Sequence, residues 1–118
     1  MPTIVNCNEV KGKIVSESGS KDLMFRDVFS KADGYTMTAS YNDVLPGGNS
    51  KNHSHPEEHI TFIVKGKGKL ICGDNSYDIS QGMAVYLSSN EPHCFRNTGD
   101  DLLVLFGILC WNKNSDNK

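Results

Sequence analysis

The sequence lacks the features that mark several special classes of protein. It has four cysteines but no Cys-x-x-Cys pair, which argues against a thiolate zinc site. Its longest apolar run, 102–111, is about half the length that a membrane-spanning helix needs. No long stretch has helical periodicity, and the first residues do not combine a basic start with an apolar segment. We therefore expect a cytoplasmic protein that neither spans a membrane nor carries a secretory signal.

The chain also lacks a large excess of charge of either sign. The chain of 118 residues has 12 basic and 14 acidic side chains, giving a net charge of −2. This balance provides no electrostatic surface for nucleic acid or for an anionic membrane, so neither is expected as a partner. Hydrophobic residues make up 37% of the chain, an ordinary share for one globular domain. We expect that domain over residues 1–111 and a disordered polar tail over 112–118.

The cysteines are widely and irregularly spaced, which does not resemble a disulfide framework. Two of them lie inside apolar, strand-like runs, and no signal segment indicates an oxidising compartment. Free, buried thiols are therefore expected at Cys7, Cys72, Cys94 and Cys110.

Short β-strands are the secondary structure that the pattern predicts, because turn residues recur about every eight to twelve positions. The expected strands are 10–15, 23–29, 35–44, 60–64, 69–72, 76–79, 83–87, 92–96 and 102–110. In 35–44, Tyr35, Met37 and Tyr41 share one parity, and we expect Met37 to fill the core. The sequence 46–49 is expected to break the chain after that strand. Many strands without a helix favour a closed or two-sheet all-β fold.

The histidines are confined to two short stretches of the sequence. His53, His55 and His59 share the same strand parity, so an extended segment could aim all three imidazoles at one point. His93 begins another expected strand and could approach them across a sheet. Converging imidazoles suit a transition metal. Spacing alone leaves open the alternative of a solvated histidine cluster without a ligand role.

The spacing around these histidines resembles the two motifs of the cupin family. The stretches are Gly47-x5-His53-x-His55-x3-His59-x6-Gly66 and Gly82-x10-His93-x3-Asn97. The resemblance implies a single-domain cupin jelly-roll barrel, also called a double-stranded β-helix. It also implies a homodimer and a metal held by the motif histidines in the barrel mouth. The apolar run 102–111 supports the homodimer, because part of it could be covered by a partner subunit.

The motifs depart from the family pattern at three positions. His59 stands where motif one has glutamate, and Ser88 and Asn90 replace the proline and glycine of motif two. Carried over by position, the ligands are four histidines and no carboxylate, as in the small all-histidine cupins: His53, His55, His59 and His93. The expected cofactor is one divalent Mn, Fe, Ni, Cu or Zn ion per subunit. Neutral ligands leave its charge uncompensated, which favours a small anionic ligand.

Three functions fit such a site. The first is a dioxygenase-like oxidoreductase acting on a small organic anion, and the second is a metal-dependent isomerase or lyase acting on a sugar-acid-like substrate. The third is a non-enzymatic small-molecule binder. No catalytic residue is identified, although Glu57 and Glu58 are possible acid–base groups. Arg26 and Tyr41 are candidates for substrate binding if they point inward.

Overall fold

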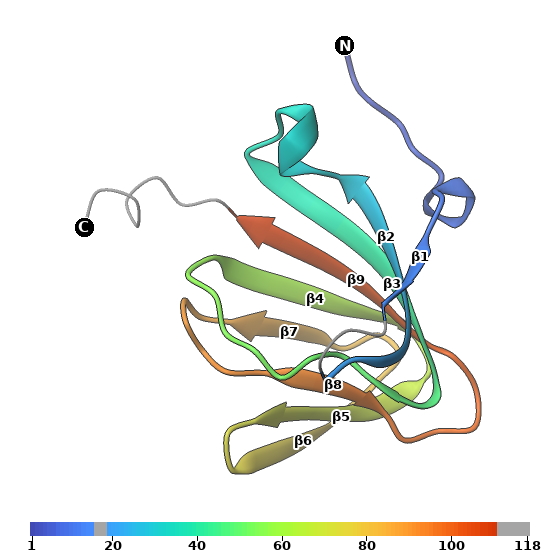
Figure 1. Ribbon diagram of the computed structural model, residues 1–118, viewed down its shortest axis with the longest axis vertical. Helices are drawn as coiled ribbons and strands as arrows, with labels where there is room; N and C mark the ends of the chain where they lie inside the picture. The colour runs from blue at the N-terminus through green and yellow to red at the C-terminus, as the bar shows by residue number, and fades with distance from the viewer. Residues whose placement is uncertain (16–18, 111–118) are drawn as a thin grey trace.

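Antiparallel strands dominate the structure, a computed structural model that describes residues 1–15 and 19–110 (Figure 1). The strands are β1 (Lys13–Val15), β2 (Lys21–Phe29), β3 (Met37–Asn49), β4 (Glu58–Lys65), β5 (Lys67–Cys72), β6 (Asn75–Ser80), β7 (Ala84–Leu87), β8 (Cys94–Asn97) and β9 (Leu103–Cys110). Two 3-10 turns, η1 (Cys7–Glu9) and η2 (Lys31–Asp33), are the only helical elements in these ranges. The all-β prediction is confirmed, whereas the predicted tail 112–118 lies outside the described residues.

The strands form one curled sheet. Its order is β6-β5-β8-β3-β9-β4-β7, with β2 added to β3 and β1 added to β2. In Figure 1, β2, β3, β9, β4 and β7 make one wall, and β8, β5 and β6 make the wall facing it. The long strand β3 belongs to both walls, because it pairs with β9 along its first part and with β8 at Asn49↔Arg96. This curl creates the interior in which the site lies.

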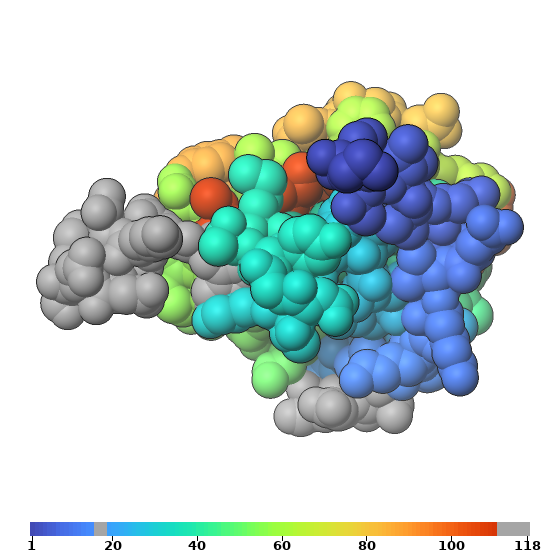
Figure 2. Space-filling view, turned by 90° about the horizontal axis from the view of Figure 1, so that it is seen from above, coloured from blue at the N-terminus to red at the C-terminus, as the bar shows by residue number. Residues whose placement is uncertain are grey.

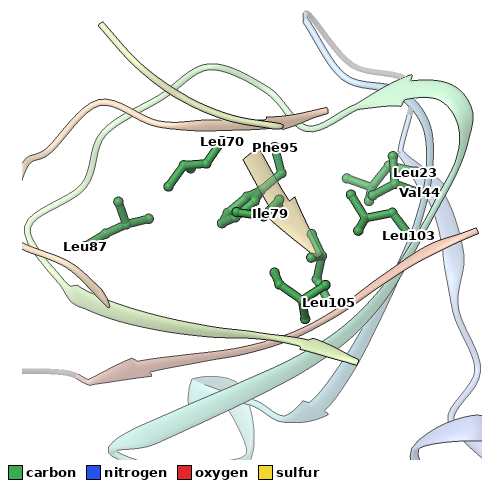
Figure 3. Packing of buried hydrophobic residues seen from close by; sticks show 9 residues of the cluster. Leu23, Val44, Leu70, Ile79, Leu87, Phe95, Leu103 and Leu105 are labelled. Atoms are coloured by element: carbon green, nitrogen blue, oxygen red, sulfur yellow. The ribbon is translucent and has the colours of Figure 1, made fainter. Parts of the chain in front are cut away.

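Aliphatic side chains from both walls fill one part of that interior. Figure 3 shows them pointing toward one another, and Val44, Ile63 and Leu103 are completely buried. Strand alternation explains the arrangement, because every second residue of β3, β4 and β9 faces inward. Burying each such side chain contributes about 1.5–3 kcal/mol to the free energy of unfolding. The cluster consists of Leu23, Val44, Ile63, Leu70, Ile79, Leu87, Phe95, Leu103 and Leu105.

Two expectations about β3 are wrong. The strand does not end at Val44 but continues to Asn49, with a φ of 80° at Gly47 and a register shift in its pairing with β2. A bulge of this kind bends a strand and disrupts its ladder only locally. The side-chain parity is also reversed, since Met37 is 58% exposed whereas Thr38 is buried. The inner face is polar at Thr38, Ser40 and Asn42, where it lines a cavity, and becomes apolar at Val44 in the core.

The N-terminal segment covers the outer face of β2. A Cβ atom on Gly12 would lie 2.5 Å from the Met24 sulfur and 3.0 Å from Arg26 Cγ, so the two segments are in close contact. Seen from above (Figure 2), the blue N-terminal residues and the turquoise η2 turn lie at the same end of the molecule.

The described cysteines are all free thiols, as predicted, although their burial differs from the expectation. Cys94 is buried and its sulfur lies 3.1 Å from the Ser50 carbonyl oxygen, whereas Cys110 is exposed at the end of β9. No helix among the described residues is long and apolar enough to cross a membrane.

The Asn97 side chain stabilises the turn that follows β8 through three hydrogen bonds. Its side-chain amide donates hydrogen bonds to the carbonyl oxygens of Val44 and Asp101, at 2.7 and 2.8 Å, and its Oδ1 accepts one from the Gly99 amide at 2.8 Å. The side chain is 2% exposed, so water cannot replace these partners.

Replacing this amide tests its structural role. Asn97→Ala should lower the free energy of unfolding by about 2–4 kcal/mol, because buried backbone groups lose their partners. Urea denaturation measures the change. The exposed Asn52→Ala should stay within about 0.5 kcal/mol of the parent. Equal effects of the two variants would contradict this account.

The outer face of the β4–β7 wall is apolar and exposed. Ile60 lies opposite both Tyr86 and Ile108, and Phe62 lies opposite Phe106. Ile60, Phe62 and Tyr86 are 48%, 44% and 60% exposed, an unusual concentration on a single sheet face. This surface is where we expect the homodimer to form.

The homodimer stays a prediction, and light scattering after gel filtration tests it. The protein should have twice the 13.0 kDa monomer mass, and Phe62→Asp should reduce it to the monomer mass. Tyr77→Asp, at an exposed aromatic residue on β6, should leave the dimer intact. A monomeric parent, or a dimer that tolerates Phe62→Asp, would contradict the prediction.

Candidate metal centre

A two-way backbone bridge brings the two histidine stretches together. The His93 amide donates to the His53 carbonyl oxygen at 2.9 Å, and the His53 amide donates to the His93 carbonyl oxygen at 3.2 Å. Flanking bonds, Ser50 amide to Phe95 carbonyl at 2.8 Å and Asn90 amide to His55 carbonyl at 2.7 Å, extend the contact. The loop before β4 therefore runs antiparallel beside the start of β8, which places residues forty positions apart side by side.

The imidazole rings gather in one cluster. The ring centroid of His93 lies 4.8 Å from that of His53, 5.1 Å from that of His55 and 5.3 Å from that of His59. One ring nitrogen from each of His53, His55 and His93 lies within 4.8 Å of the other two. Small side-chain rotations would bring these nitrogens to the spacing of ligands around one ion, about 4 Å or less.

Backbone carbonyl groups set the tautomer of the three imidazoles. The Nδ1 atoms of His53, His55 and His93 lie 2.8, 3.1 and 2.9 Å from the carbonyl oxygens of Lys51, Glu57 and Glu91. A carbonyl oxygen can only accept, so each Nδ1 carries the proton and each Nε2 keeps a free lone pair. Metal-binding histidines are commonly oriented in this way.

One of these nitrogens is buried without a partner. His93 is 2% exposed, and its Nε2 has no hydrogen-bond partner among the described residues. A buried polar atom in this state requires an explanation, and a metal ion that accepts its lone pair supplies one. The donor set therefore fits a divalent transition metal.

His59 lies at the edge of this group and is oriented differently. It projects from the start of β4, where its Nε2 lies 2.9 Å from the Thr61 hydroxyl oxygen. Its Nδ1 is buried without a hydrogen-bond partner among the described residues. The structure thus brings all four predicted ligands together but gives only three of them converging nitrogens. The role of His59 as a fourth ligand stays a prediction.

Burial favours the neutral form of three of the imidazoles. It is the main cause that lowers the pKa of His53, His59 and His93, and neighbouring imidazoles lower each pKa further. The effect is largest for His59, whose pKa falls to about 4. Neutral imidazole is the form that binds metal, so these side chains are ready for coordination at neutral pH.

A cavity of about 310 Å³ lies beside the histidines, inside the curl of the sheet. Its wall combines the imidazoles with the inner faces of β2, β3 and β9. The apolar part is formed by Val15, Leu23, Phe25, Phe95, Leu105 and Leu109. The polar part beyond the histidines includes Asp27, Thr38, Ser40, Asn42 and Ser50. A small organic molecule can therefore approach the nitrogens through a largely apolar cavity.

Arg26 and Tyr41 are not among the residues that line this cavity. They are cross-strand partners, and the Arg26 guanidinium lies 5.9 Å from the centre of the Tyr41 ring. Arg26 also forms an ion pair with Asp43 at 2.9 Å. Their neighbours Phe25, Asp27, Ser40 and Asn42 face the cavity, so strand alternation directs Arg26 and Tyr41 to the opposite face.

The two glutamates of motif one also take different places. The carboxylate of Glu57 lies 3.5 Å from His55 Nδ1, where it can orient that imidazole. Glu58 accepts a hydrogen bond from the Tyr86 hydroxyl on the outer face of the sheet. Sequence reasoning missed Asp27, Ser40 and Asn42. The signal for Ser40 and Asn42 is the alternation of polar residues along β3, but the expectation that Met37 fills the core places these polar residues on the opposite face.

Comparison with known proteins identifies the family. A family model described as "Cupin domain" matches residues 41–111, which include the four histidines and both glycine-led spacings. The chain belongs to the cupin family. Structures with the same fold include the polyketide cyclase RemF from Streptomyces resistomycificus, with a TM-score of 0.83 and 24% identity over 95% of this chain and 81% of that one. A predicted oxalate decarboxylase from Thermotoga maritima also has a TM-score of 0.83, with 22% identity over 92% of this chain and 98% of that one.

One relative of this cupin has an enzyme name. The 1-methylthio-D-xylulose 5-phosphate methylsulfurylase of Rhodospirillum rubrum is 31% identical over 85 residues, which is 72% of this chain. The match spans 53% of the methylsulfurylase, so only about half of that protein corresponds to this cupin. The names of these similar proteins refer to different reactions, so they indicate no single reaction for this chain.

The lowered histidine pKa values predict how acid affects the metal-free protein. Between pH 6.5 and about 4, the unfolded chain binds protons at His59 that the folded protein does not bind. The free energy of unfolding should therefore fall as the pH is lowered through this window. Urea denaturation in the presence of EDTA measures it at several pH values.

His59→Phe is the control for this titration. Removing the imidazole should reduce the pH dependence between pH 6.5 and 4, whatever its effect on stability at pH 7.5, and His53 and His93 should account for part of what remains. An unchanged slope in the variant would contradict the assigned role of His59.

Proposed function

We propose that this cupin binds one divalent transition metal per subunit and acts as a dioxygenase-like oxidoreductase on a small organic anion. His53, His55 and His93 would hold the ion, with His59 able to serve as a fourth ligand. The observation that carries the proposal is that these three histidines each place a ring nitrogen within 4.8 Å of the other two. In each ring, Nδ1 is hydrogen-bonded to a backbone carbonyl oxygen, which leaves Nε2 free to bind a metal. The ion would be Mn, Fe, Ni, Cu or Zn, all of which accept imidazole ligands.

The charge of the site supports an anionic ligand. Burial lowers the pKa of His53, His59 and His93, which favours their neutral form, and the Glu57 carboxylate lies beside His55 Nδ1, on the side away from the free nitrogen. A bound ion would keep its +2 charge and supply open positions for a chelating anion and dioxygen. The surrounding residues would exclude bulk water, because much of the cavity wall is apolar.

Metal analysis tests the binding part of the proposal. Protein purified without a metal-affinity step and reconstituted with Fe²⁺ or Mn²⁺ should contain about one ion per chain by mass spectrometry. His53→Gln and His93→Gln should lose most of that ion, because each removes one converging nitrogen. Cys110→Ser removes an exposed thiol and should leave the metal content unchanged. Retention of the ion in both histidine variants would contradict the site.

Oxygen uptake tests the reaction. The Fe- or Mn-loaded protein should consume oxygen in the presence of a suitable small keto or hydroxy acid, and His93→Gln should abolish the uptake. Turnover without oxygen, maintained by Zn²⁺, would favour the metal-dependent isomerase or lyase over the oxygenase. Stoichiometric metal binding without any turnover in such a screen would favour the non-enzymatic binder.

A further inference from the structure

The wall of the cavity has two chemically different parts. Near the histidines, the inner face of β9 is apolar, with Leu105 and Leu109 lining the cavity. Farther away, on β2 and β3, polar groups appear among the apolar ones. A ligand that binds the metal and fills this space therefore meets an apolar surface first and a polar edge second.

The polar edge is continuous with the site through one row of paired residues. Thr61 on β4 is the register partner of Gly107 on β9, Gly107 is the partner of Ser40 on β3, and Ser40 is the partner of Asp27 on β2. All four residues line the cavity. Neighbouring strands lie about 4.8 Å apart, so the row spans roughly 14 Å from Thr61 to Asp27.

Gly107 lets the His59 imidazole lie close to β9 in the middle of this row. A Cβ atom at this position would lie 3.0 Å from His59 Nε2 and 3.4 Å from the Ser40 hydroxyl oxygen, so these two side chains occupy the space above the glycine. Leu105 and Leu109, two positions away on the same strand face, line the cavity on either side of it.

Asp27 lies at the far end of the row. Its carboxylate has no hydrogen bond or ion pair with any other described residue, and water solvates it because the residue is exposed. A ligand that fills the cavity as far as Asp27 would displace part of this water. The carboxylate would then need a donor from the ligand, because an ionised group that loses its water without a new partner is strongly disfavoured.

We propose that the substrate of this site is amphipathic. Metal-chelating oxygens lie at one end, a flat apolar body packs against Leu105 and Leu109 in the cavity, and an amine or hydroxyl group donates to Asp27 at the other end. The inference rests on the proposed metal centre and deepens it by naming a substrate class. It assigns Asp27 and Leu109 to substrate selection, and these positions lie outside the motif histidines.

A series of hydroxamates tests the proposal by isothermal titration calorimetry with the zinc-loaded protein. Acetohydroxamate carries only the chelating group, benzohydroxamate adds the flat apolar body, and its 4-aminomethyl and 4-(2-aminoethyl) derivatives add a donor. Benzohydroxamate should bind about tenfold more tightly than acetohydroxamate. At least one amine derivative should gain a further factor of about five or more, because its ammonium group donates a charge-assisted hydrogen bond to the Asp27 carboxylate.

Three variants assign these gains to residues. Leu109→Gln should reduce the benzohydroxamate gain and leave acetohydroxamate binding unchanged. Asp27→Asn should remove the amine gain and leave benzohydroxamate binding unchanged. Asp22→Asn makes the same change of charge on the same strand outside the cavity lining, so it should retain every gain.

The outcomes separate this inference from the metal centre. If acetohydroxamate binds but the ring and the amine add nothing, the amphipathic substrate is wrong and the metal centre stands. If no hydroxamate binds to protein that is shown to contain zinc, the open metal centre is wrong, and the inference fails with it. An amine gain that persists in Asp27→Asn would overturn the role of Asp27.

Discussion

The two backbone hydrogen bonds between His53 and His93 are the contact on which the site depends. They hold the loop before β4 against the start of β8, so that imidazoles from opposite walls of the sheet share one point. Without this bridge, the two histidine stretches would belong to separate strands with no reason to converge. The curl of the sheet makes the bridge possible, because β3 pairs with β9 in one wall and with β8 in the other.

The second constraint is electrical neutrality at the converging nitrogens. Carbonyl oxygens hold a proton on each Nδ1, and burial lowers the pKa of His53 and His93, so the free nitrogens face one another without charge repulsion. These ligands need not release protons before they bind a cation. Because it also leaves the cation's charge intact, the chemistry of the site is directed toward anions, and the apolar wall of the cavity strengthens that attraction by limiting water.

The sequence predicted most of the strands and the family, because turn signals and the spacing within a motif are local properties. It failed where the answer depends on which strands pair. The polar parity of β3 reads as a solvent face until β9 and β2 are known to lie beside it around a cavity, and Met37 was placed in the core for this reason. The continuation of β3 through Gly47 depends on a bulge opposite β2. Likewise, only the register between β2, β3 and β9 places Asp27 in line with Gly107.

X-ray absorption spectroscopy of the protein loaded with one equivalent of Zn²⁺ tests the central claim most directly. The account predicts nitrogen or oxygen scatterers near 2.0–2.1 Å and the multiple-scattering pattern of at least three imidazoles. A spectrum with one imidazole or none, or with a sulfur ligand near 2.3 Å, would contradict it.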